Sequence, residues 1–458
     1  MNSEVIDGLR AIVGEDWVIA EVEKILGYLL DETPESIRPE AVRDVVVVKP
    51  RSAEEVSKIL KLANEFGIPV FPRGGGTGLV GGCIPTLSGI VLSLERMKNL
   101  VVDRDNLIAE AEAGVTLAEL IEAAEKAGLF FPLHPGDEGA QIGGLIACNA
   151  GGVRAIKTGV MRNYVKGIEV VLPTGEIMTL GGKILKNNAG YDLMHLIIGS
   201  EGTLGVITKA WIKLEPKPRA SATIIIPFDD RRKALKAVPE MFREGIIPIA
   251  VEYIERRLAD RAAEELGMTW PCREGEYHLM VILTESSEDE LFSKCEKLLK
   301  LCERIGALEP ILAERREDQE RILRIRSGLH LAVEKGLVDI LDVTVPPARM
   351  VELIEAVEEL ARRRGTDLPV FGHAGDGNLH IHLMEQEGWG EEDYEELRNE
   401  IYRKAIELGG TITGEHGIGY TRRKSFEKFI DKKALELMRR IKKIFDPNNI
   451  LNPDKIFL

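Results

Sequence analysis

The sequence of 458 residues predicts an α+β protein with two main domains. Three observations support this fold class. β-Branched runs such as Val45-Val-Val-Val48 alternate with amphipathic stretches and with runs of glycine through the first half of the chain. Pro216 and Pro218 then interrupt the pattern, because proline is excluded from central strands and helix interiors. Beyond them, strands and helices alternate again, which is typical of an antiparallel sheet covered by helices.

The first half begins with short helices, which we expect to end at Pro34 and Pro39. Ser52, followed three residues later by Glu55, is typical of a helix start, and that helix should end at Gly67. In the first domain, strands are expected at 45–48, 68–71, 89–94, 107–112, 165–172 and 205–214.

In the second domain, we expect strands at 223–227, 249–253 and 277–283 and helices at 230–244 and 287–305. The predicted organisation is therefore an N-terminal helical segment (1–40), a glycine-rich domain (41–217), a second domain (218–420) and a C-terminal helical segment (421–458).

The net charge of −15 argues against a nucleic-acid or anionic-membrane partner, because such partners need a basic surface. The five cysteines include no C-x-x-C pair, so neither a zinc knuckle nor an iron-sulfur cluster is indicated. No secretory signal and no apolar window of membrane-spanning length are apparent, and we expect a cytoplasmic protein without a membrane span.

The first glycine run, Pro72-Arg-Gly-Gly-Gly-Thr-Gly78, follows an expected strand, where side-chain-free backbone can bring several N–H groups against a phosphate. Gly76, Gly78 and Gly81 match the Rossmann dinucleotide pattern, but a strand rather than a helix is expected to follow, which excludes that fold. No Gly-Lys-Ser/Thr follows, which also excludes a Walker loop. On this motif alone, a glycine turn without a ligand stays open.

Two further glycine blocks occur, Pro135-Gly-Asp-Glu-Gly-Ala-Gln-Ile-Gly-Gly-Leu-Ile-Ala-Cys-Asn-Ala-Gly-Gly152 and Gly199-Ser-Glu-Gly-Thr-Leu-Gly-Val-Ile-Thr208. In this order, the three blocks resemble the FAD-binding blocks of the vanillyl-alcohol oxidase and p-cresol methylhydroxylase flavoproteins. The resemblance implies a two-part FAD-binding domain of p-cresol methylhydroxylase type and a C-terminal antiparallel-sheet cap domain. It also implies FAD contacts from Pro72, Arg73, Gly74, Gly75, Gly76, Thr77 and Gly78 (pyrophosphate), from Pro135, Gly136, Gly139, Ile142, Gly143, Gly144, Asn149 and Gly152 (ribityl chain and flavin), and from Glu201 and Ile207 (adenosine end).

Members of this family that bind FAD covalently often carry a histidine in the first glycine loop. Residues 76–78 contain none, so we expect dissociable FAD.

Histidines gather in two short blocks, Gly372-His-Ala-Gly-Asp-Gly-Asn-Leu-His-Ile-His-Leu383 and Gly414-Glu-His-Gly-Ile-Gly419. A strand period of two places His380 and His382 on one face, with His373 approaching from the preceding turn. Together with Glu415, these imidazoles form an N/O ligand set that suits zinc or another divalent transition ion.

The same blocks resemble the D-2-hydroxy-acid dehydrogenase branch of the family, which includes glycolate oxidase flavin subunits, D-lactate dehydrogenases and D-2-hydroxyglutarate dehydrogenases. The resemblance implies His373, His380 and Glu415 as metal ligands and His416 as the base. Some members carry a polar amide where His382 stands, so His382 stays open as a fourth ligand or a substrate contact.

Arg326 matches the arginine with which this branch holds the substrate carboxylate, and His330 lies one turn later. A solvated helix charge is the alternative for Arg326, because residues 314–326 form a mixed-charge helix. Dicarboxylate-specific members carry a lysine shortly before the strand that reads Asp339-Ile-Leu-Asp-Val-Thr-Val-Pro346 here. We expect that lysine to be missing, which favours D-lactate, glycolate or another monocarboxylate over D-2-hydroxyglutarate.

The resemblance implies oxidation of the 2-hydroxy acid to a 2-oxo acid, with hydride transfer to the flavin. Reduced flavin then needs an electron acceptor: an iron-sulfur subunit, an electron-transfer flavoprotein, a quinone or oxygen. An acceptor at the membrane would make the protein peripheral there, and a homodimer is a further option. Two other classes stay open, a lipid enzyme of the alkyl-dihydroxyacetone-phosphate synthase type and a non-catalytic flavin subunit.

Overall fold

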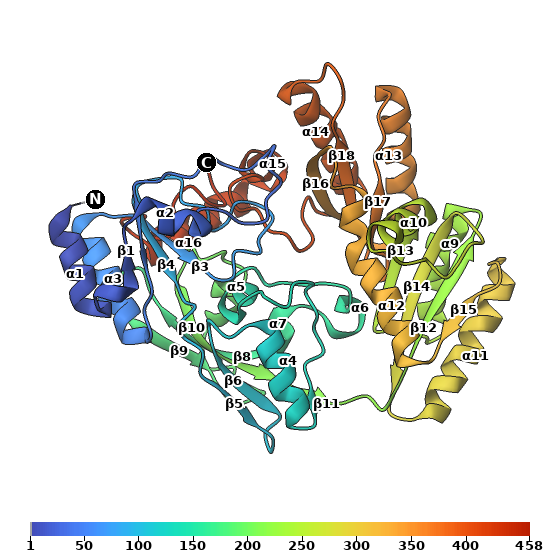
Figure 1. Cartoon of the computed structure of the whole chain (residues 1–458), viewed down its shortest axis with the longest axis horizontal. Coiled ribbons are helices and arrows are strands. Elements are labelled where there is room, and N and C mark those ends of the chain that lie inside the picture. The colour runs from blue at the N-terminus through green and yellow to red at the C-terminus, as the bar shows by residue number, and fades with distance from the viewer. Residues whose placement is uncertain (1) are drawn as a thin grey trace. The chain divides into compact units, whose positions relative to one another are not determined.

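A computed structural model describes residues 2–458 of the chain, which divides into two compact units (Figure 1). Unit 1 comprises the residues up to Ala150, Val160–Lys217 and Glu415–Leu458, and unit 2 comprises Gly151–Gly159 and Pro218–Gly414. The division at Lys217 lies within the Pro216-Lys-Pro218 sequence.

Two short segments belong to the opposite unit from the one expected. Residues 151–159 belong to unit 2 because α6 (Ala155–Thr158) contacts β13 (Ala250–Glu255). Residues 415–420 belong to unit 1, where the Tyr420 N–H donates to the Val80 carbonyl at 2.8 Å.

The first sheet of unit 1 has the strand order β1-β2-β4-β3. Strands β2, β4 and β3 run parallel, and the two-residue β1 pairs antiparallel with β2. The expectation of helices alone before residue 40 missed β1, which is too short to show a period of two. The sheet consists of β1 (Val18–Ile19), β2 (Val45–Val48), β3 (Val70–Arg73) and β4 (Gly89–Ser93), with α1 (Ser3–Val13), α2 (Val22–Ile25) and α3 (Ala53–Phe66) in the same part of the chain.

Helix α3 has both ends that the sequence predicts. The Ser52 hydroxyl accepts a hydrogen bond from the Glu55 N–H at 3.3 Å, and Gly67 ends the helix with φ of 62°. Glycine suits that end because the left-handed conformation strains residues that have a Cβ. Its buried residues Val56, Ile59, Leu60 and Ala63 belong to the same core as the parallel strands.

The second sheet of unit 1 is antiparallel, with the order β5-β6-β10-β8-β9. Its central strand β10 alternates buried and partly exposed residues, so one face lies on the core. The strands of this sheet are β5 (Leu100–Asp103), β6 (Ile108–Glu112), β8 (Val165–Val171), β9 (Ile177–Gly181) and β10 (Val206–Lys213). A separate small sheet pairs β7 (Leu129–Phe130) with β11 (Glu215–Pro216). The other α-helices of unit 1 are α4 (Leu117–Lys126), α5 (Ile142–Ala147), α7 (Met161–Tyr164), α8 (Met194–Ile197), α15 (Arg423–Phe429) and α16 (Lys432–Phe445).

Unit 2 is built on one seven-stranded sheet with the order β15-β12-β14-β13-β17-β18-β16. All of its pairings are antiparallel, which confirms the predicted antiparallel-sheet domain. Besides β13, its strands are β12 (Ala220–Phe228), β14 (Tyr277–Glu285), β15 (Ile311–Ala313), β16 (Leu337–Thr344), β17 (Val370–His373) and β18 (Asn378–Met384).

Helices pack on this sheet, as Figure 1 shows for α9 and α11 beside β12 and β14. α14 contacts β16, and α13 packs against α9 and α14. In residues 2–458, no helix is both long and apolar enough to cross a membrane. The helices of unit 2 are α6, α9 (Arg231–Arg243), α10 (Arg256–Glu265), α11 (Glu288–Ile305), α12 (Arg316–Ser327), α13 (Met350–Arg364) and α14 (Glu391–Glu407).

Candidate active site

The first two glycine blocks lie against each other in unit 1. A Cβ at Gly75 would lie 2.9 Å from the Gly139 carbonyl oxygen, and one at Gly74 would lie 3.6 Å from the Gly144 Cα. Real Cβ atoms do not approach a carbonyl oxygen that closely, so the contact at Gly75 requires glycine. The run after β3 leads through a loop into β4 without a helix, so the context of a Rossmann fold is missing.

The third glycine block packs on the end of the second. The Gly199 N–H donates to the Ile146 carbonyl at 3.1 Å, and the Glu201 N–H donates to the Ala147 carbonyl at 2.8 Å. Three segments that are distant in the sequence therefore form one glycine-rich surface of unit 1.

The Arg73 side chain lies under its own loop. Its guanidinium donates to the carbonyls of Leu30 at 2.7 Å and Gly27 at 3.0 Å, and it closely contacts Gly76, whose φ is +76°. A phosphate at this loop would therefore meet backbone N–H groups, while Arg73 holds the loop in shape.

The glycine-rich surface fits FAD because backbone is accessible there. A Cβ at Gly136 or Gly144 would meet no atom within 4 Å. Asn149, with φ of +51°, turns the chain after α5, and its side-chain oxygen accepts from the Arg162 N–H at 3.0 Å. Most of the remaining predicted FAD residues lie on these same segments: Pro72 in β3, Thr77 and Gly78 in the first loop, Pro135, Ile142 and Gly143 in the second block, and Ile207 in β10. Gly152, the last residue of the second block, belongs to unit 2.

The Glu201 carboxylate binds the backbone at the end of the second histidine block. Its two oxygens accept from the N–H groups of Ile418 at 2.9 Å and Gly419 at 2.7 Å. Burial raises the pKa of Glu201 above its ordinary value, because its effect is larger than that of the two hydrogen bonds, which lower the pKa. The structure thus places Glu201 as an anchor of the segment after His416.

In unit 2, the candidate residues Asp342, His373, His380 and His382 lie in one row across the three adjacent strands β16, β18 and β17, here called the histidine row. Asp342 of β16 is paired with His380 of β18, and His380 is paired with Phe371 of β17. Residues paired across antiparallel strands share a face, and a step of two keeps that face. His373 and His382 therefore lie on it too. The opposite face carries Leu341, Leu379 and Ile381, which are fully buried.

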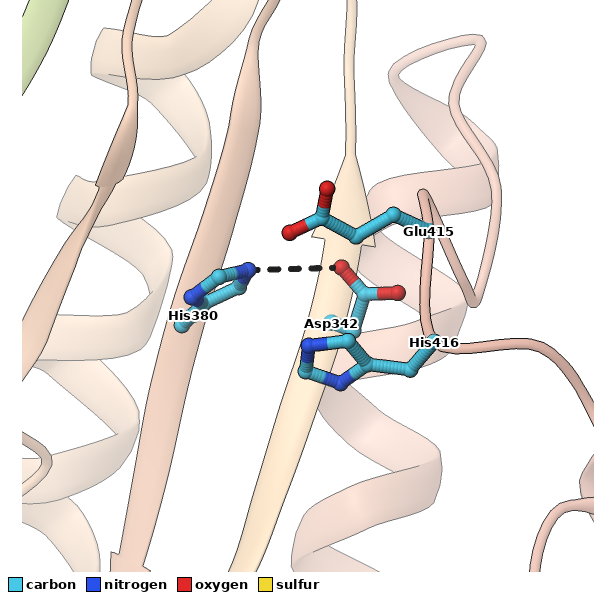
Figure 2. A group of neighbouring side chains, drawn as sticks. All are labelled: Asp342, His380, Glu415 and His416. Atoms are coloured by element: carbon cyan, nitrogen blue, oxygen red, sulfur yellow. Dashed lines mark ion pairs between the residues drawn. The ribbon is translucent and has the colours of Figure 1, made fainter. Parts of the chain in front are cut away.

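The side chains of Asp342, His380, Glu415 and His416 point toward one another (Figure 2). One potential ligand atom from each lies within 4.8 Å of the others, and His380 Nε2 is 3.6 Å from Asp342 Oδ1. The structure brings together three residues singled out in the sequence and adds Asp342.

Sequence reasoning missed Asp342, which is almost fully buried. Its carboxylate accepts from Asn378 Nδ2 at 2.7 Å, from the Thr413 hydroxyl at 2.9 Å and from the Gly414 N–H at 2.9 Å. It therefore holds the chain immediately before Glu415. An acid in the middle of a buried strand was the available signal, since such a group needs a partner or a metal.

His373 contacts a different carboxylate. Its Nδ1 lies 2.7 Å from Glu252 Oε1 on β13, and its ring centroid is 5.4 Å from that of His380. The other Glu252 oxygen accepts from Arg326, whose Nε lies 2.7 Å away. Burial raises the pKa of Glu252, but the charges of Arg326 and His373 outweigh it and hold that pKa below its ordinary value.

The two other predicted substrate residues have local partners. His382 is buried, stacks on Phe371 at 4.5 Å between ring centroids, and places its Nδ1 3.1 Å from the Pro369 carbonyl. His330 is exposed, and its Nδ1 lies 2.9 Å from the Ser327 carbonyl. Arg326 is held in an ion pair rather than solvated, unlike the exposed charges elsewhere on α12.

The donor set fits a divalent transition ion. Imidazole nitrogens and carboxylate oxygens are the ligands that zinc takes when no cysteine is present. His380 and Glu415 belong to the close group, with Asp342 as a further carboxylate, and His373 faces Glu252 with its Nδ1.

Comparison with known families gives two matches. Residues 45–181 match the FAD binding domain family, and residues 217–456 match the family of FAD linked oxidases, C-terminal domain.

Among curated proteins, the chain is 47% identical over 429 residues to D-lactate dehydrogenase of Archaeoglobus fulgidus, which covers 94% of this chain and 95% of the relative. It is 36% identical to glycolate oxidase subunit GlcD of Bacillus subtilis, which covers 94% of this chain and 92% of that protein. It is also 31% identical to a probable mitochondrial D-2-hydroxyglutarate dehydrogenase of Oryza sativa, over 100% of this chain and 82% of that protein.

Among solved structures, p-cresol methylhydroxylase with substrate bound aligns with a TM-score of 0.78 at 17% identity, covering 99% of this chain and 96% of that one. Alkyldihydroxyacetonephosphate synthase aligns with a TM-score of 0.75 at 19% identity, covering 99% and 86%. These likenesses confirm the predicted fold. The family matches, which include the first two glycine blocks and the histidine row, and the curated relatives together show that the chain is a flavoprotein oxidoreductase and belongs to the FAD-linked oxidase family.

Proposed function

We propose that this chain oxidises a small D-2-hydroxy acid, D-lactate or glycolate, to the 2-oxo acid, with non-covalent FAD and a divalent ion, zinc, in the histidine row. The observation that carries this proposal is the group of Asp342, His380, Glu415 and His416, in which a potential base stands next to potential metal ligands. Relatives named D-lactate dehydrogenase and glycolate oxidase subunit support the substrate class.

When bound, FAD supplies a hydride acceptor and the divalent ion lowers the pKa of the substrate hydroxyl. His416 accepts the hydroxyl proton on a ring nitrogen, because an imidazole is a competent base near neutral pH. Arg326 binds the substrate carboxylate, to which a guanidinium can offer parallel N–H donors. His382 is buried against Phe371, which favours a role in positioning or ligation over one exposed to solvent.

The substrate preference rests on the relatives and not on a missing lysine. The expectation that no lysine precedes the strand from Asp339 was wrong, since Lys335 lies two residues before β16 and is exposed. D-2-Hydroxyglutarate is therefore an alternative substrate, and a relative named for it at 31% identity supports its inclusion in the test.

We expect the electron acceptor to be a partner protein or a quinone. The relative named as a subunit of glycolate oxidase supports a partner protein. The structural likeness to alkyldihydroxyacetonephosphate synthase is at 19% identity and concerns the fold alone.

The test mixes FAD-loaded protein anaerobically with D-lactate, L-lactate, glycolate and D-2-hydroxyglutarate, before and after chelator treatment, and follows the visible flavin absorbance. We expect bleaching by a D-acid or glycolate that chelator abolishes and added Zn²⁺ or Mn²⁺ restores. Flavin that stays oxidised with every acid would overturn the substrate class and favour a lipid-synthase or subunit role. Bleaching that survives complete metal removal would overturn the metal while keeping the dehydrogenase.

A further inference from the structure

Glu252 contacts two of the residues singled out above. Its side chain is 1% exposed. Oε1 lies 2.7 Å from His373 Nδ1, while Oε2 accepts from Arg326 Nε at 2.7 Å and also from Nη2. A carboxylate this deep in the protein is retained only with strong partners.

The strand register explains the placement. Tyr253 of β13 is paired with Gly372 of β17 in antiparallel fashion. The next pair along the same two strands is Glu252 and His373, and paired residues share a face. Glu252 therefore extends the row that contains His373 and His380, while Arg326 reaches it from α12.

The contact determines which nitrogen of His373 carries the proton. An ionised carboxylate can only accept hydrogen bonds, so Nδ1 carries the proton and Nε2 keeps its lone pair. A histidine that ligates a metal in proteins usually donates its other N–H to an oxygen acceptor in this way.

The contact also leaves Arg326 partly free. Nε and Nη2 are engaged by Glu252, and Nη2 also lies 3.3 Å from His373 Nδ1, while in residues 2–458 Nη1 makes no hydrogen bond. The donors on Nη1 can thus meet a carboxylate while the rest of the guanidinium stays fixed.

We propose that Glu252 is a positioning residue that sets the His373 tautomer for metal ligation and, with its other oxygen, aims Arg326 at the substrate carboxylate. This inference rests on the proposed function. It assigns one side chain to two tasks, because a single carboxylate joins the metal side of the row to the substrate side.

Glu252→Gln separates the two tasks because a glutamine has only one acceptor oxygen. If its oxygen faces His373, its NH₂ meets the Arg326 donors. If its oxygen faces Arg326, its NH₂ forces the proton of His373 onto Nε2, which prevents ligation there. The matched control is Glu255→Gln on the same strand. Glu255 is also buried and also binds arginines, with Arg231 Nη2 at 3.0 Å and Arg257 Nε at 2.7 Å.

The experiment measures Zn²⁺ affinity of the FAD-loaded protein by competition with a chromogenic chelator, and the KM for D-lactate in metal-saturated protein. We expect E252Q either to lose about 10–100-fold in Zn²⁺ affinity or, where the oxygen faces His373, to keep that affinity and show a raised KM, while E255Q stays within about twofold of wild type in both. A folded E252Q with both the Zn²⁺ affinity and the KM of wild type would overturn the inference.

If E252Q does not fold, the double variant Glu252→Met with Arg326→Met removes both charges, so that neither is left buried alone. It should show the same loss of Zn²⁺ affinity, and wild-type affinity in this variant would likewise overturn the inference. If wild-type protein binds neither Zn²⁺ nor Mn²⁺, the metal in the proposed function fails, and this inference fails with it. Failure of the metal can be told apart from failure of this inference alone, because it would be seen in the wild-type protein.

Discussion

Unit 1 presents its candidate ligand surface mainly as backbone, whereas unit 2 presents its candidate site as side chains. In unit 1, Gly75 lies against Gly139 with no space for a Cβ, and Gly144 is open on its outer side. In unit 2, charged and imidazole groups project from one face of a sheet whose other face is apolar. A backbone surface is fixed by the fold itself, while a side-chain row can change its chemistry without changing the fold. Substitutions should therefore have different consequences in the two units.

The largest expected effect is that of His416→Gln. Loss of a general base should slow anaerobic flavin reduction by D-lactate about 10²–10⁴-fold, while FAD content and Zn²⁺ affinity stay near wild type. Stopped-flow absorbance measures the rate, and His195→Gln, at a partly exposed, ion-paired histidine in unit 1, is the control. A loss of Zn²⁺ affinity would instead assign His416 to the ligands, and an unchanged rate would remove it from both roles.

The next effect concerns Arg326→Lys. A lysine carries a single ammonium group, so it cannot bind Glu252 through two separate nitrogens and also offer a third to a substrate carboxylate. We expect KM for D-lactate to rise about 10–100-fold, with a smaller change in kcat. Arg324→Lys, on the same helix but exposed, should leave both constants unchanged. Equal behaviour of the two variants would mean that Arg326 only stabilises unit 2.

Adjacent glycines of α5 test the backbone surface of unit 1. A Cβ at Gly143 would lie 2.7 Å from the Ala113 Cβ, whereas one at Gly144 would meet no protein atom within 4 Å. Gly143→Ala should destabilise the FAD-free protein by about 1–3 kcal/mol. Gly144→Ala should leave that stability unchanged or slightly higher, and should weaken FAD binding alone. Thermal unfolding and FAD titration separate the two, and wild-type FAD affinity in Gly144→Ala would place the cofactor elsewhere.

The smallest effect concerns Lys455, a buried charged side chain in unit 1. Burial lowers its pKa from 10.5 to about 8, and its Nζ lies 5.3 Å from the Phe71 ring centroid. Between those pKa values the unfolded chain binds a proton that the folded chain does not, so stability rises with pH. From pH 7.5 to 9.5, FAD-free wild type should gain about 1–2 kcal/mol relative to Lys455→Met. Parallel pH profiles of unfolding in the two proteins would show that Lys455 is solvated.

The sequence was most informative where a local rule acts. Ser52, Glu55 and Gly67 predict both ends of α3, because capping depends on neighbours in the chain. The glycine blocks could be singled out as candidate ligand surfaces for a similar reason, since the absence of a side chain can be read at each position of the sequence.

The residues that sequence reasoning missed act over long separations. Glu252 contacts Arg326 and His373, which are 74 and 121 residues away along the chain, and Asp342 contacts Asn378, 36 residues away. These contacts depend on the register of β13 with β17 and of β16 with β18. Without that register, nothing in the sequence distinguishes Glu252 from the many other acidic residues of the chain.

The interleaving of the two units also bears on synthesis by the ribosome. Unit 2 is complete once Gly414 has emerged, but unit 1 requires residues from the end of the chain. The Asn452 N–H donates to the Val70 carbonyl at 2.7 Å, and Lys442 Nζ donates to the Thr203 carbonyl at 2.9 Å. Domains tend to fold as units as they are made. Unit 2 can therefore finish folding first, while the parallel strands near residues 45–93 still lack their contacts with residues 442–452.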